Sequence, residues 1–434
     1  MMIWRMAVLA LILGGVCTLN SKADPAASSA SEVPGTQLNW DDCVRLAIQH
    51  NPDLQASREA VINSDAVRLG AYSALYPQIS LSFGDNRSRN VPNLFSPYSY
   101  STSYSEQVSV SQLIFDGFKT KGNIDQARAQ LNLAFADLDG EKAIVSFNLK
   151  SSFAQLLYAQ KLIKISQQVI DIQQANARLV KLLYEGGSED KGNMQLSQAN
   201  LDEAIYKLDQ AVRTRDLSGI QLGVYIGQNL APPVLAEGEL QTDILPVTPD
   251  FNQLAVLTPS YFQHKAEVDA AAAGITIANS GWYPSVNADA NAYRADSQFP
   301  LKGKGWSAGF SVSYPLFQGG ATYFDVKAAS ASLRQALDNL RSGTNDAALT
   351  LAQMFKGMID AEDNVRIQQE ILDATALRYK ISEADYKNGL MSFQDFNTIT
   401  DDYVNQLQTL LSAQLSAVIA EASWEEARGL GAIP

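Results

Sequence analysis

The sequence predicts an α+β membrane protein that is internally duplicated, with four membrane-spanning β-strands in each chain and long α-helical coiled coils beyond them. Three observations predict this fold class: two long intervals without proline, short segments in which polar and apolar residues alternate, and a set of residues that recurs 202 positions later.

The first 23 residues have the pattern of a cleaved signal peptide. Arg5 precedes an unbroken apolar run at residues 6–16, and small residues follow it. Cys17 suggests a site for a lipid anchor, but the residue before it is valine, whereas a lipidation signal needs Gly, Ala or Ser at that position. We therefore expect an exported chain without a lipid anchor, with an N-terminal extension over 24–45.

The rest of the chain contains no apolar run of ~18 residues, so we expect no membrane-spanning helix, and entry into a membrane would need a β-barrel. The formal charge of −13 argues against nucleic-acid partners, which select basic surfaces. Cys43 is the one cysteine after the signal peptide, so the exported chain cannot form an internal disulfide. Packing and strand pairing must hold it together.

Long helices are expected within the intervals 98–231 and 316–433, because these intervals lack proline, which interrupts helices. In the second interval a coiled-coil phase persists over 355–379, but Glu362 and Gln369 occupy seam positions and predict a wetter contact. In the first interval residues recur with alternating spacings of four and three, the pattern of a coiled-coil seam. These residues are Tyr158, Leu162, Ile165, Val169, Ile172, Asn176, Leu179 and Leu183.

An internal repeat relates the two halves of the chain. Most of the recurring residues are separated by 202 positions, but Pro52 and the pair Tyr76-Pro77, which precede them, recur after 207 positions. The second copy therefore has a loop that is five residues shorter. A repeat of this length indicates a duplicated half-protein rather than a solenoid unit. The residues that recur after 202 positions are Ser109, Val110, Ser111, Phe115, Gly117, Tyr184 and Gly187, with counterparts Ser311, Val312, Ser313, Phe317, Gly319, Tyr386 and Gly389.

Each half contains two segments with a period of two, which predict β-hairpins at 76–115 and 283–317. Ile79, Leu81 and Phe83, for example, alternate with polar residues, so one face of the hairpin is apolar and the other polar. Segments of about ten such residues match membrane-spanning strands, and aromatic residues lie near their ends. A soluble hairpin with one wet face is the alternative interpretation.

Four strands cannot close a barrel, because the bacterial minimum is about eight and an open edge is excluded from lipid. A membrane barrel must therefore be shared between chains. A dimer would supply eight strands and a trimer twelve, and the residues themselves do not choose between them.

These features resemble the TolC-like outer-membrane efflux proteins, also called outer-membrane factors. The resemblance covers nearly all of the chain after the signal peptide, and the order of its parts carries it more than any single motif. Its residues are Leu46-Ala47 with Asn51-Pro52, then Tyr76-Pro77 and Tyr283-Pro284, and the run Tyr314-Pro315-Leu316-Phe317-Gln318-Gly319-Gly320.

The resemblance implies a homotrimer that shares a twelve-stranded barrel in the outer membrane, continued by a periplasmic tunnel of twelve helices. It implies a passive exit duct of a tripartite efflux pump or a type I secretion system. Docking of a periplasmic adaptor (membrane fusion) protein and an inner-membrane pump or ABC transporter would open the duct. Outer-membrane lipid would surround the barrel, and the pump rather than the duct would select the cargo.

The implied organisation has two structural repeats, 46–227 and 251–428, joined by an irregular linker at 228–250 and followed by a tail at 429–434. The expected long helices are 118–184 and 320–386. Their shorter partners are expected at 46–73, 193–227, 252–280 and 393–428.

By the same resemblance, two helix turns dock the adaptor. The second turn has the apolar pattern of the family, whereas Glu189, Asp190 and Lys191 make the first turn charged, which questions symmetrical docking. The glycines of both turns also predict left-handed helix caps. The docking candidates are Gly187, Ser188, Gly389, Leu390, Met391 and Ser392, and the expected strand-to-helix turns contain Gly117, Pro315, Gly319 and Gly320.

Asp395, Tyr184, Tyr386 and Arg378 are the candidates for the periplasmic entrance and its gating. The tyrosines lie where the family ties neighbouring helices together, and Arg378 could supply a further link, or could belong to a solvated helix face. Asp395 aligns with an acidic position that forms a constricting ring in some members, where three carboxylates would attract cations. The alternative is that Asp395 stabilises a helix start capped by Ser392.

We find no catalytic constellation in the sequence. His50 and His264 lack Cys or carboxylate partners at metal-binding spacing, and no glycine-rich phosphate loop is present. We therefore expect no enzymatic activity, no cofactor and no bound metal. The alternative function is a soluble periplasmic coiled-coil scaffold, which would be released from cells without detergent.

Overall fold

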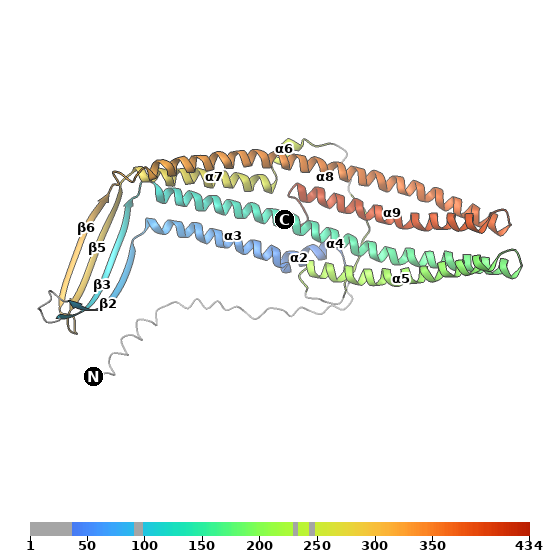
Figure 1. Cartoon of the computed structure of the whole chain (residues 1–434), viewed down its shortest axis with the longest axis horizontal. Coiled ribbons are helices and arrows are strands. Elements are labelled where there is room, and N and C mark those ends of the chain that lie inside the picture. The colour runs from blue at the N-terminus through green and yellow to red at the C-terminus, as the bar shows by residue number, and fades with distance from the viewer. Residues whose placement is uncertain (1–36, 91–98, 229–232, 243–247) are drawn as a thin grey trace.

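The computed structural model describes residues 37–90, 99–228, 233–242 and 248–434. It shows an elongated molecule with a β-sheet at one end and two helix turns at the other, and with the C-terminus near the middle (Figure 1). The expected signal peptide at 1–23, including Cys17, lies outside the described residues. The sheet and the helix turns, where function is expected, are at opposite ends of the molecule.

Two pairs of long helices form most of the length. α4 (Lys119–Glu185) turns into α5 (Lys191–Tyr225), and α8 (Ala321–Lys387) turns into α9 (Phe393–Ala427). These bounds lie within two residues of the predicted ones. α4 and α8 each contain 67 residues, which corresponds to on the order of 100 Å at ~1.5 Å per residue.

Shorter helices accompany the long ones. Single helices were predicted at 46–73 and 252–280, but the structure has two helices in each of these regions. Each break directly precedes a proline, which lacks an N–H and restricts the residue before it, so the prediction of continuous helices was wrong. The first of these helices also begins inside the expected 24–45 extension. The four helices are α2 (Trp40–His50), α3 (Pro52–Ala71), α6 (Phe251–Ala255) and α7 (Pro259–Asn279).

Asn51 occupies the first of these breaks and is almost fully buried. Its side-chain oxygen accepts hydrogen bonds from the N–H groups of Asp53 and Leu54, both at 3.0 Å, which caps α3. Its amide nitrogen donates to the carbonyl of Tyr225 at 3.0 Å. One side chain therefore starts α3 and joins it to the end of α5.

The four strands form one antiparallel sheet in the order β2-β3-β5-β6. Short 3₁₀ helices, η2 (Tyr72–Leu75) and η3 (Ser280–Trp282), precede the two hairpins, which lie where the alternation predicted them. An irregularity in register between Leu113 and Phe115 lies where β3 meets β5. The strands are β2 (Gln78–Asn90), β3 (Ser99–Phe115), β5 (Ser285–Asp296) and β6 (Gly303–Ser313).

The two halves present the same order of elements: two short helices, a hairpin, a long helix and a further helix. α5 and α9 both have 35 residues, and α3 and α7 have 20 and 21. The segment between the halves contributes β4 (Leu235–Ala236), which pairs in parallel with β1 (Gln37–Leu38). Gln160 of α4 fixes this pair, because it exchanges two hydrogen bonds of 2.8 Å with the backbone of Ala236.

Two hydrophobic cores lie at the middle of the molecule. In the first, Leu149 and Leu156 of α4 pack with Cys43 of α2 and Leu222 of α5. Burial, and then the charge of Asp42, raise the pKa of the Cys43 thiol to about 12, so this cysteine is an inert core residue.

In the second core, Trp424 of α9 contacts Phe355 of α8 and Phe251 of α6 with ring centroids 5.2 and 6.5 Å away. Nearby, Lys150 of α4 forms ion pairs with Glu421 (2.9 Å) and Glu425 (3.0 Å) of α9. Both the aromatic contacts and the ion pairs join α9 to the rest of the bundle.

The predicted seams differ in burial as expected. Every seam residue of α4 between Tyr158 and Leu183 is buried or half-buried, whereas Gln369 in the seam of α8 is exposed. None of the helices in the described part of the chain combines the length and the apolar composition needed to cross a membrane.

Candidate functional site

The two helix turns at the far end of the bundle have the same backbone geometry. Gly187 and Gly389 adopt left-handed conformations, with φ of 77° and 71°. The following N–H groups, of Ser188 and Leu390, donate to carbonyls five residues back at 2.8 and 2.9 Å. This pattern is a Schellman motif, which satisfies carbonyls at a helix end. The predicted left-handed caps are confirmed at both turns.

The helices that leave the turns begin with side-chain caps. Asp190 accepts from the N–H of Asn193 at 2.9 Å, and the Ser392 hydroxyl accepts from the N–H of Asp395 at 3.1 Å. The same hydroxyl donates to the Asp395 carboxylate at 2.7 Å. The capping role expected for Asp395 is therefore present in the single chain, and its side chain remains exposed.

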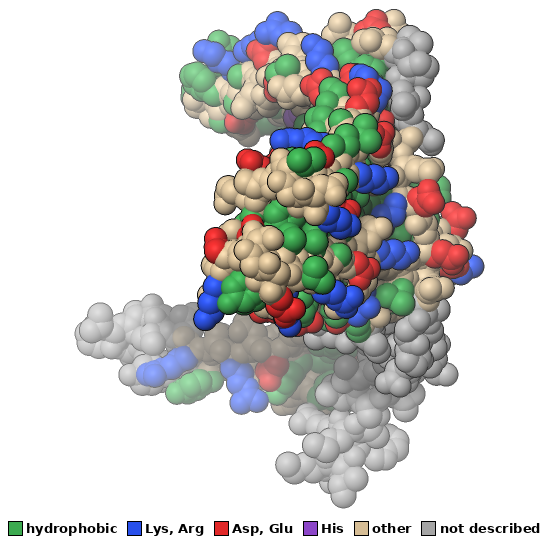
Figure 2. Space-filling model, turned by 90° about the vertical axis from the view of Figure 1, so that its right-hand side faces the viewer, with side chains coloured by type: hydrophobic (Ala, Val, Ile, Leu, Met, Phe, Trp, Pro, Cys, Tyr) green, Lys and Arg blue, Asp and Glu red, His purple; other side chains and the backbone are tan. Residues whose placement is uncertain are grey.

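The surfaces of the two turns differ chemically. Leu390 is 77% exposed at the tip of the second turn, and Met391 is half-buried beside it. The first turn instead carries Glu185, Glu189 and Asp190. Figure 2, which faces this end of the molecule, shows charged side chains of both signs interspersed with apolar ones.

A small aromatic core lies directly behind the second turn. The ring of Tyr386 stacks on Phe396 of α9 with centroids 4.7 Å apart, and it lies at 6.2 Å from Phe393. The Tyr386 hydroxyl is buried and has no hydrogen-bond partner among the described residues. Burial, and then the charges of Glu189 and Asp190, raise the pKa of Tyr386.

Tyr184, at the equivalent position of the first half, is 37% exposed. The two tyrosines were predicted as equivalent ties between helices, and the structure separates them into a buried core residue and a surface residue. Tyr379 of α8 does join two helices, because its hydroxyl donates a hydrogen bond to the side chain of Asn176 on α4 at 3.4 Å. Burial, and then Glu383 and Tyr403, raise the pKa of Tyr379 to about 12.

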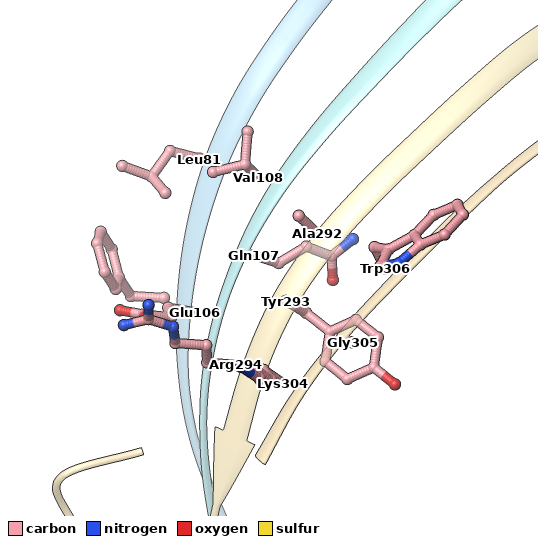
Figure 3. Close-up of a pocket in the computed structure, with 11 residues that line it drawn as sticks. Leu81, Glu106, Gln107, Val108, Ala292, Tyr293, Arg294, Lys304, Gly305 and Trp306 are labelled. Atoms are coloured by element: carbon pink, nitrogen blue, oxygen red, sulfur yellow. The ribbon is translucent and has the colours of Figure 1, made fainter. Parts of the chain in front are cut away.

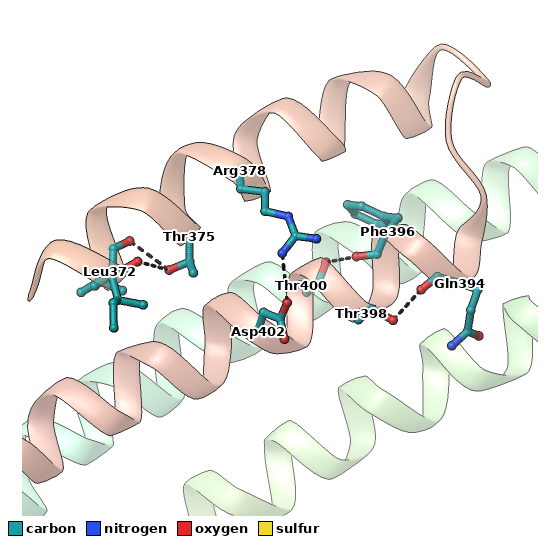
Figure 4. A network of polar contacts seen from close by, with 9 residues as sticks. Leu372, Thr375, Arg378, Gln394, Phe396, Thr398, Thr400 and Asp402 are labelled. Atoms are coloured by element: carbon teal, nitrogen blue, oxygen red, sulfur yellow. Dashed lines mark hydrogen bonds and ion pairs between the residues drawn. The ribbon is translucent and has the colours of Figure 1, made fainter. Parts of the chain in front are cut away.

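Arg378 links the two helices of the second pair, as Figure 4 shows. Its guanidinium donates to the carboxylate of Asp402 on α9 at 3.3 Å, and both side chains are exposed. Around this pair, the hydroxyls of Thr375, Thr398 and Thr400 bond to carbonyls of their own helices. Thr398, three residues after Asp395, thus carries a hydroxyl that bonds to its own helix backbone.

A further link was missed by the sequence reasoning. Asn200 of α5 donates to Asn397 of α9 at 2.9 Å, and Asn397 donates to Asp401 at 3.0 Å. Burial, and then the charge of Glu203, raise the pKa of Asp401. The repeat gave no signal for this link, because the residue 202 positions after Asn200 is Asp402 and not Asn397.

The strand-to-helix turns require left-handed backbone in both halves. Gly319 and Gly320 have φ of 63° and 87°, and Gly117 has φ of 67°. Phe118, which aligns with Gly320, is also left-handed with φ of 70°, an uncommon conformation for a bulky residue. Its ring packs edge-on against Phe115 and Tyr283, at 5.4 and 6.0 Å, and these contacts offset the strain. Pro315 lies just beyond the end of β6.

The sheet has one polar and one apolar face, as the alternation predicted. On the polar face, the hydroxyls of Ser80 and Ser109 lie 2.7 Å apart, and Gln107 donates to Asn291 at 3.2 Å. The apolar face is largely exposed to its surroundings in the single chain. Its exposed side chains include Ile79, Leu81, Phe83, Val108, Trp306, Phe310 and Val312.

The structure shows no group of metal-binding side chains in the described part of the chain. His50 is exposed, and His264 lies 3.1 Å from Glu267, a carboxylate neighbour that the sequence reasoning overlooked. A single His-carboxylate pair on a helix surface is a common ion-pair geometry. It supplies neither a nucleophile nor a metal site.

The chain matches the Outer membrane efflux protein family over residues 43–228 and 252–430. It is 21% identical over 390 residues to the outer membrane efflux protein BepC of Brucella suis, with 86% of this chain and 80% of BepC covered. It is 22% identical over 488 residues to the probable efflux pump outer membrane protein TtgC of Pseudomonas putida, and this alignment covers 98% of this chain and 95% of TtgC.

The fold is similar to solved outer-membrane channels. The CusC structure aligns with a TM-score of 0.79 at 18% identity and covers 90% of this chain and 92% of that chain. The open state of the Neisseria gonorrhoeae MtrE outer membrane channel aligns with a TM-score of 0.77 at 16% identity, over 94% of each chain.

Proposed function

Because the chain belongs to the outer membrane efflux protein family, we propose that it forms a homotrimeric channel-tunnel that serves as a passive exit duct. Members of the family are outer-membrane proteins, so the chain is an outer-membrane protein with a large periplasmic portion. In this proposal a periplasmic adaptor and an inner-membrane pump or ABC transporter dock to the duct and open it. We assign the chain to transport and give it no catalytic role.

The four-stranded sheet carries the proposal. Within the described residues, β2 pairs with β3 alone and β6 pairs with β5 alone, so both edges of the sheet are open. Unpaired backbone groups at an edge cost several kcal/mol each in lipid. Pairing β6 of one copy with β2 of the next removes every edge, and three copies give the twelve strands that we propose.

The helices support the same arrangement. α8 and α5 carry large apolar side chains that have no cover in the single chain. Neighbouring copies would bury them and close the tunnel laterally. They include Ile367, Ile371, Leu377 and Ile381 on α8, and Ile205, Tyr206 and Leu217 on α5.

For the turns, we propose unequal docking surfaces. Gly389, Leu390, Met391 and Ser392 present an apolar tip that suits an apolar adaptor surface. The first turn, with Gly187 and Ser188, presents acidic side chains that suit a polar or basic contact. Such an arrangement would let one adaptor distinguish the two helix pairs.

At the entrance, we propose that Asp395 of three copies forms an acidic ring in addition to capping α9. Its carboxylate is exposed, and it accepts the Ser392 hydroxyl without a cationic partner among the described residues. Arg378, paired with Asp402, would hold the two helices of the second pair together near the ring. Tyr386 would fix the turn by packing, and Tyr184 would face the neighbouring helices.

The test begins with membranes that are washed with salt and then extracted with mild detergent. We expect a protein of trimer mass in the detergent fraction alone, measured by light scattering with the detergent mass subtracted. A monomer or dimer in the salt wash would contradict the proposal and favour a soluble periplasmic scaffold.

Ion selectivity of the reconstituted trimer tests the ring. Asp395→Asn is expected to lower the preference for cations over anions, as measured from reversal potentials under a salt gradient. Asp338→Asn, which removes an exposed carboxylate on α8 paired with Arg341, is the matched control and should leave selectivity unchanged. Equal effects of the two substitutions would exclude a ring at Asp395.

A further inference from the structure

Two neighbouring cross-strand rows on the apolar face of the sheet differ sharply in chemistry. The first row is Leu81, Val108, Ala292 and Trp306, and the next row toward the hairpin loops is Phe83, Glu106, Arg294 and Lys304. Since side chains two residues apart on a strand point to the same face, both rows lie on one surface.

These rows line a hollow of about 720 Å³. The backbone of the intervening residues Gln107, Tyr293 and Gly305 completes its lining, because their side chains point to the polar face. Figure 3 shows Trp306 on one side and Leu81 with Val108 on the other. Trp306 is 80% exposed and Phe83 is 64% exposed. An exposed tryptophan beside a hollow and two cations forms an amphipathic surface, with an apolar part and a charged part.

The charged row lies at the level of a membrane interface in the proposed barrel. On β5, apolar residues occupy this face from Val286 to Ala292, and Arg294 follows eight residues after Val286. Eight residues at ~3.3 Å each give about 26 Å along the strand, or on the order of 20 Å along the membrane normal for a tilt of ~40°. Lipid-facing cations are tolerated near an interface and are costly at the midplane.

The charges of this row do not cancel. Arg294 lies 3.6 Å from Glu106, and both side chains are partly exposed. Lys304, directly opposite Arg294 on β6, forms no ion pair with any residue that the structure describes. Directly paired residues on neighbouring strands have Cβ atoms about 5 Å apart, so both cations can reach a single anion.

We propose that this hollow binds one outer-leaflet lipid, with its phosphate headgroup between Arg294 and Lys304. Its acyl chain lies along Leu81, Val108, Ala292 and Trp306, toward the membrane centre. This orientation of the lipid agrees with the sheet, because the row that holds the two cations is nearer the hairpin loops than the apolar row is. This inference rests on the proposed function, since membrane insertion alone presents this face to lipid.

The test uses the full detergent-extracted protein, reconstituted in nanodiscs that contain equal amounts of phosphatidylglycerol and phosphatidylcholine with identical acyl chains. Lipids that remain bound after gentle release are counted by native mass spectrometry. We expect retention of phosphatidylglycerol in preference to phosphatidylcholine. Each interfacial cation contributes about a fivefold factor in affinity for anionic lipid, so R294Q/K304Q should weaken retention by about thirtyfold.

Two comparisons make the result specific. R87Q/K302Q removes two cations at the same end of the sheet but outside the hollow, and should change retention less than twofold. E106Q frees Arg294 from its carboxylate and should increase retention. Inorganic phosphate at millimolar concentration should fail to displace the lipid, because it lacks the acyl chain.

Equal losses in R294Q/K304Q and R87Q/K302Q, equal retention of the two lipids, or displacement by inorganic phosphate would each overturn the lipid site. A trimer that extracts with detergent but retains no preferred lipid refutes this inference and leaves the proposed channel intact. A protein found in the salt wash refutes the channel itself, so the two failures are distinguishable.

Discussion

Tyr386→Phe should stabilise the turn between α8 and α9, although the residue lies at a position predicted for gating. The tyrosine is 3% exposed, and its ring stacks on Phe396 at a centroid distance of 4.7 Å. Its hydroxyl is buried without a hydrogen-bond partner among the described residues. The substitution keeps the stacked ring and removes only the unsatisfied hydroxyl.

The size of the effect follows from these contacts. A buried hydroxyl that loses its water without gaining a partner costs ~1–3 kcal/mol, so its removal should stabilise the turn by about 1 kcal/mol or more. Phe396→Ala, which removes the stacked partner, should instead cost ~3–5 kcal/mol. Tyr184→Phe is the matched control, because an exposed hydroxyl remains hydrated and its loss should be close to neutral.

Hydrogen exchange followed by mass spectrometry on the detergent-extracted protein measures this stability locally. Peptides that cover the end of α8 and the start of α9 should exchange about fivefold more slowly in Tyr386→Phe, because local opening becomes rarer by ~1 kcal/mol. Channel conductance should stay at the wild-type level. Faster exchange, or a channel that opens without its partners, would refute the reasoning and show that the hydroxyl gains a bond in the assembled protein.

Three other substitutions test the core and the backbone by thermal unfolding. Gly227→Ala should lower Tm far more than Gly187→Ala, although both glycines have positive φ. A Cβ at position 227 would lie 2.3 Å from a backbone carbonyl oxygen at the end of α2, whereas a Cβ at position 187 would meet nothing within 4 Å. Lys150→Met removes the ammonium that pairs with Glu421 and Glu425 of α9, and should cost ~1.5–3 kcal/mol because these side chains are only partly buried. Burial, and then the charge of Glu421, raise the pKa of Glu362, so stability should fall as pH rises through that pKa; Glu362→Gln should raise Tm at pH 8 and have little effect at pH 4.

Local signals predicted the long helices and the hairpins accurately. The absence of proline and the alternation of residue types act within a few residues, so they gave element bounds close to those observed for α4, α5, α8 and α9. The break between α2 and α3 was missed, although its signals were local as well. Asn39 caps α2 by accepting from the N–H of Asp42 at 2.8 Å, and Asn51 caps the next helix.

The candidate site was predicted less completely, because its contacts join residues on different helices. Arg378 was expected to form a link, but its partner Asp402 lies 24 residues away, beyond the turn. The unequal burial of Tyr184 and Tyr386 also depends on the partner helix. Phe396 covers Tyr386, whereas the residue 202 positions earlier is Met194, which gives Tyr184 no aromatic partner.

The two longest helices differ in how much of each is covered within the single chain. α4 and α8 both have 67 residues, but 25 residues of α4 are buried and only seven of α8. α4 lies between other helices of its own chain, whereas α8 runs along the outer edge of the bundle (Figure 1).

The uncovered apolar residues of α8 are not scattered. Ile367, Ile371, Leu377 and Ile381 fall within about 120° of one another at ~100° per residue, so they form one stripe. Burying each would contribute on the order of 1 kcal/mol, and the stripe repeats in every copy. The wet seam at Glu362 and Gln369 is then consistent with a helix whose main apolar contact is with a neighbouring chain. The proposed trimer accounts for this difference, since α4 is covered by helices of its own chain and the stripe of α8 would be covered by a neighbouring copy.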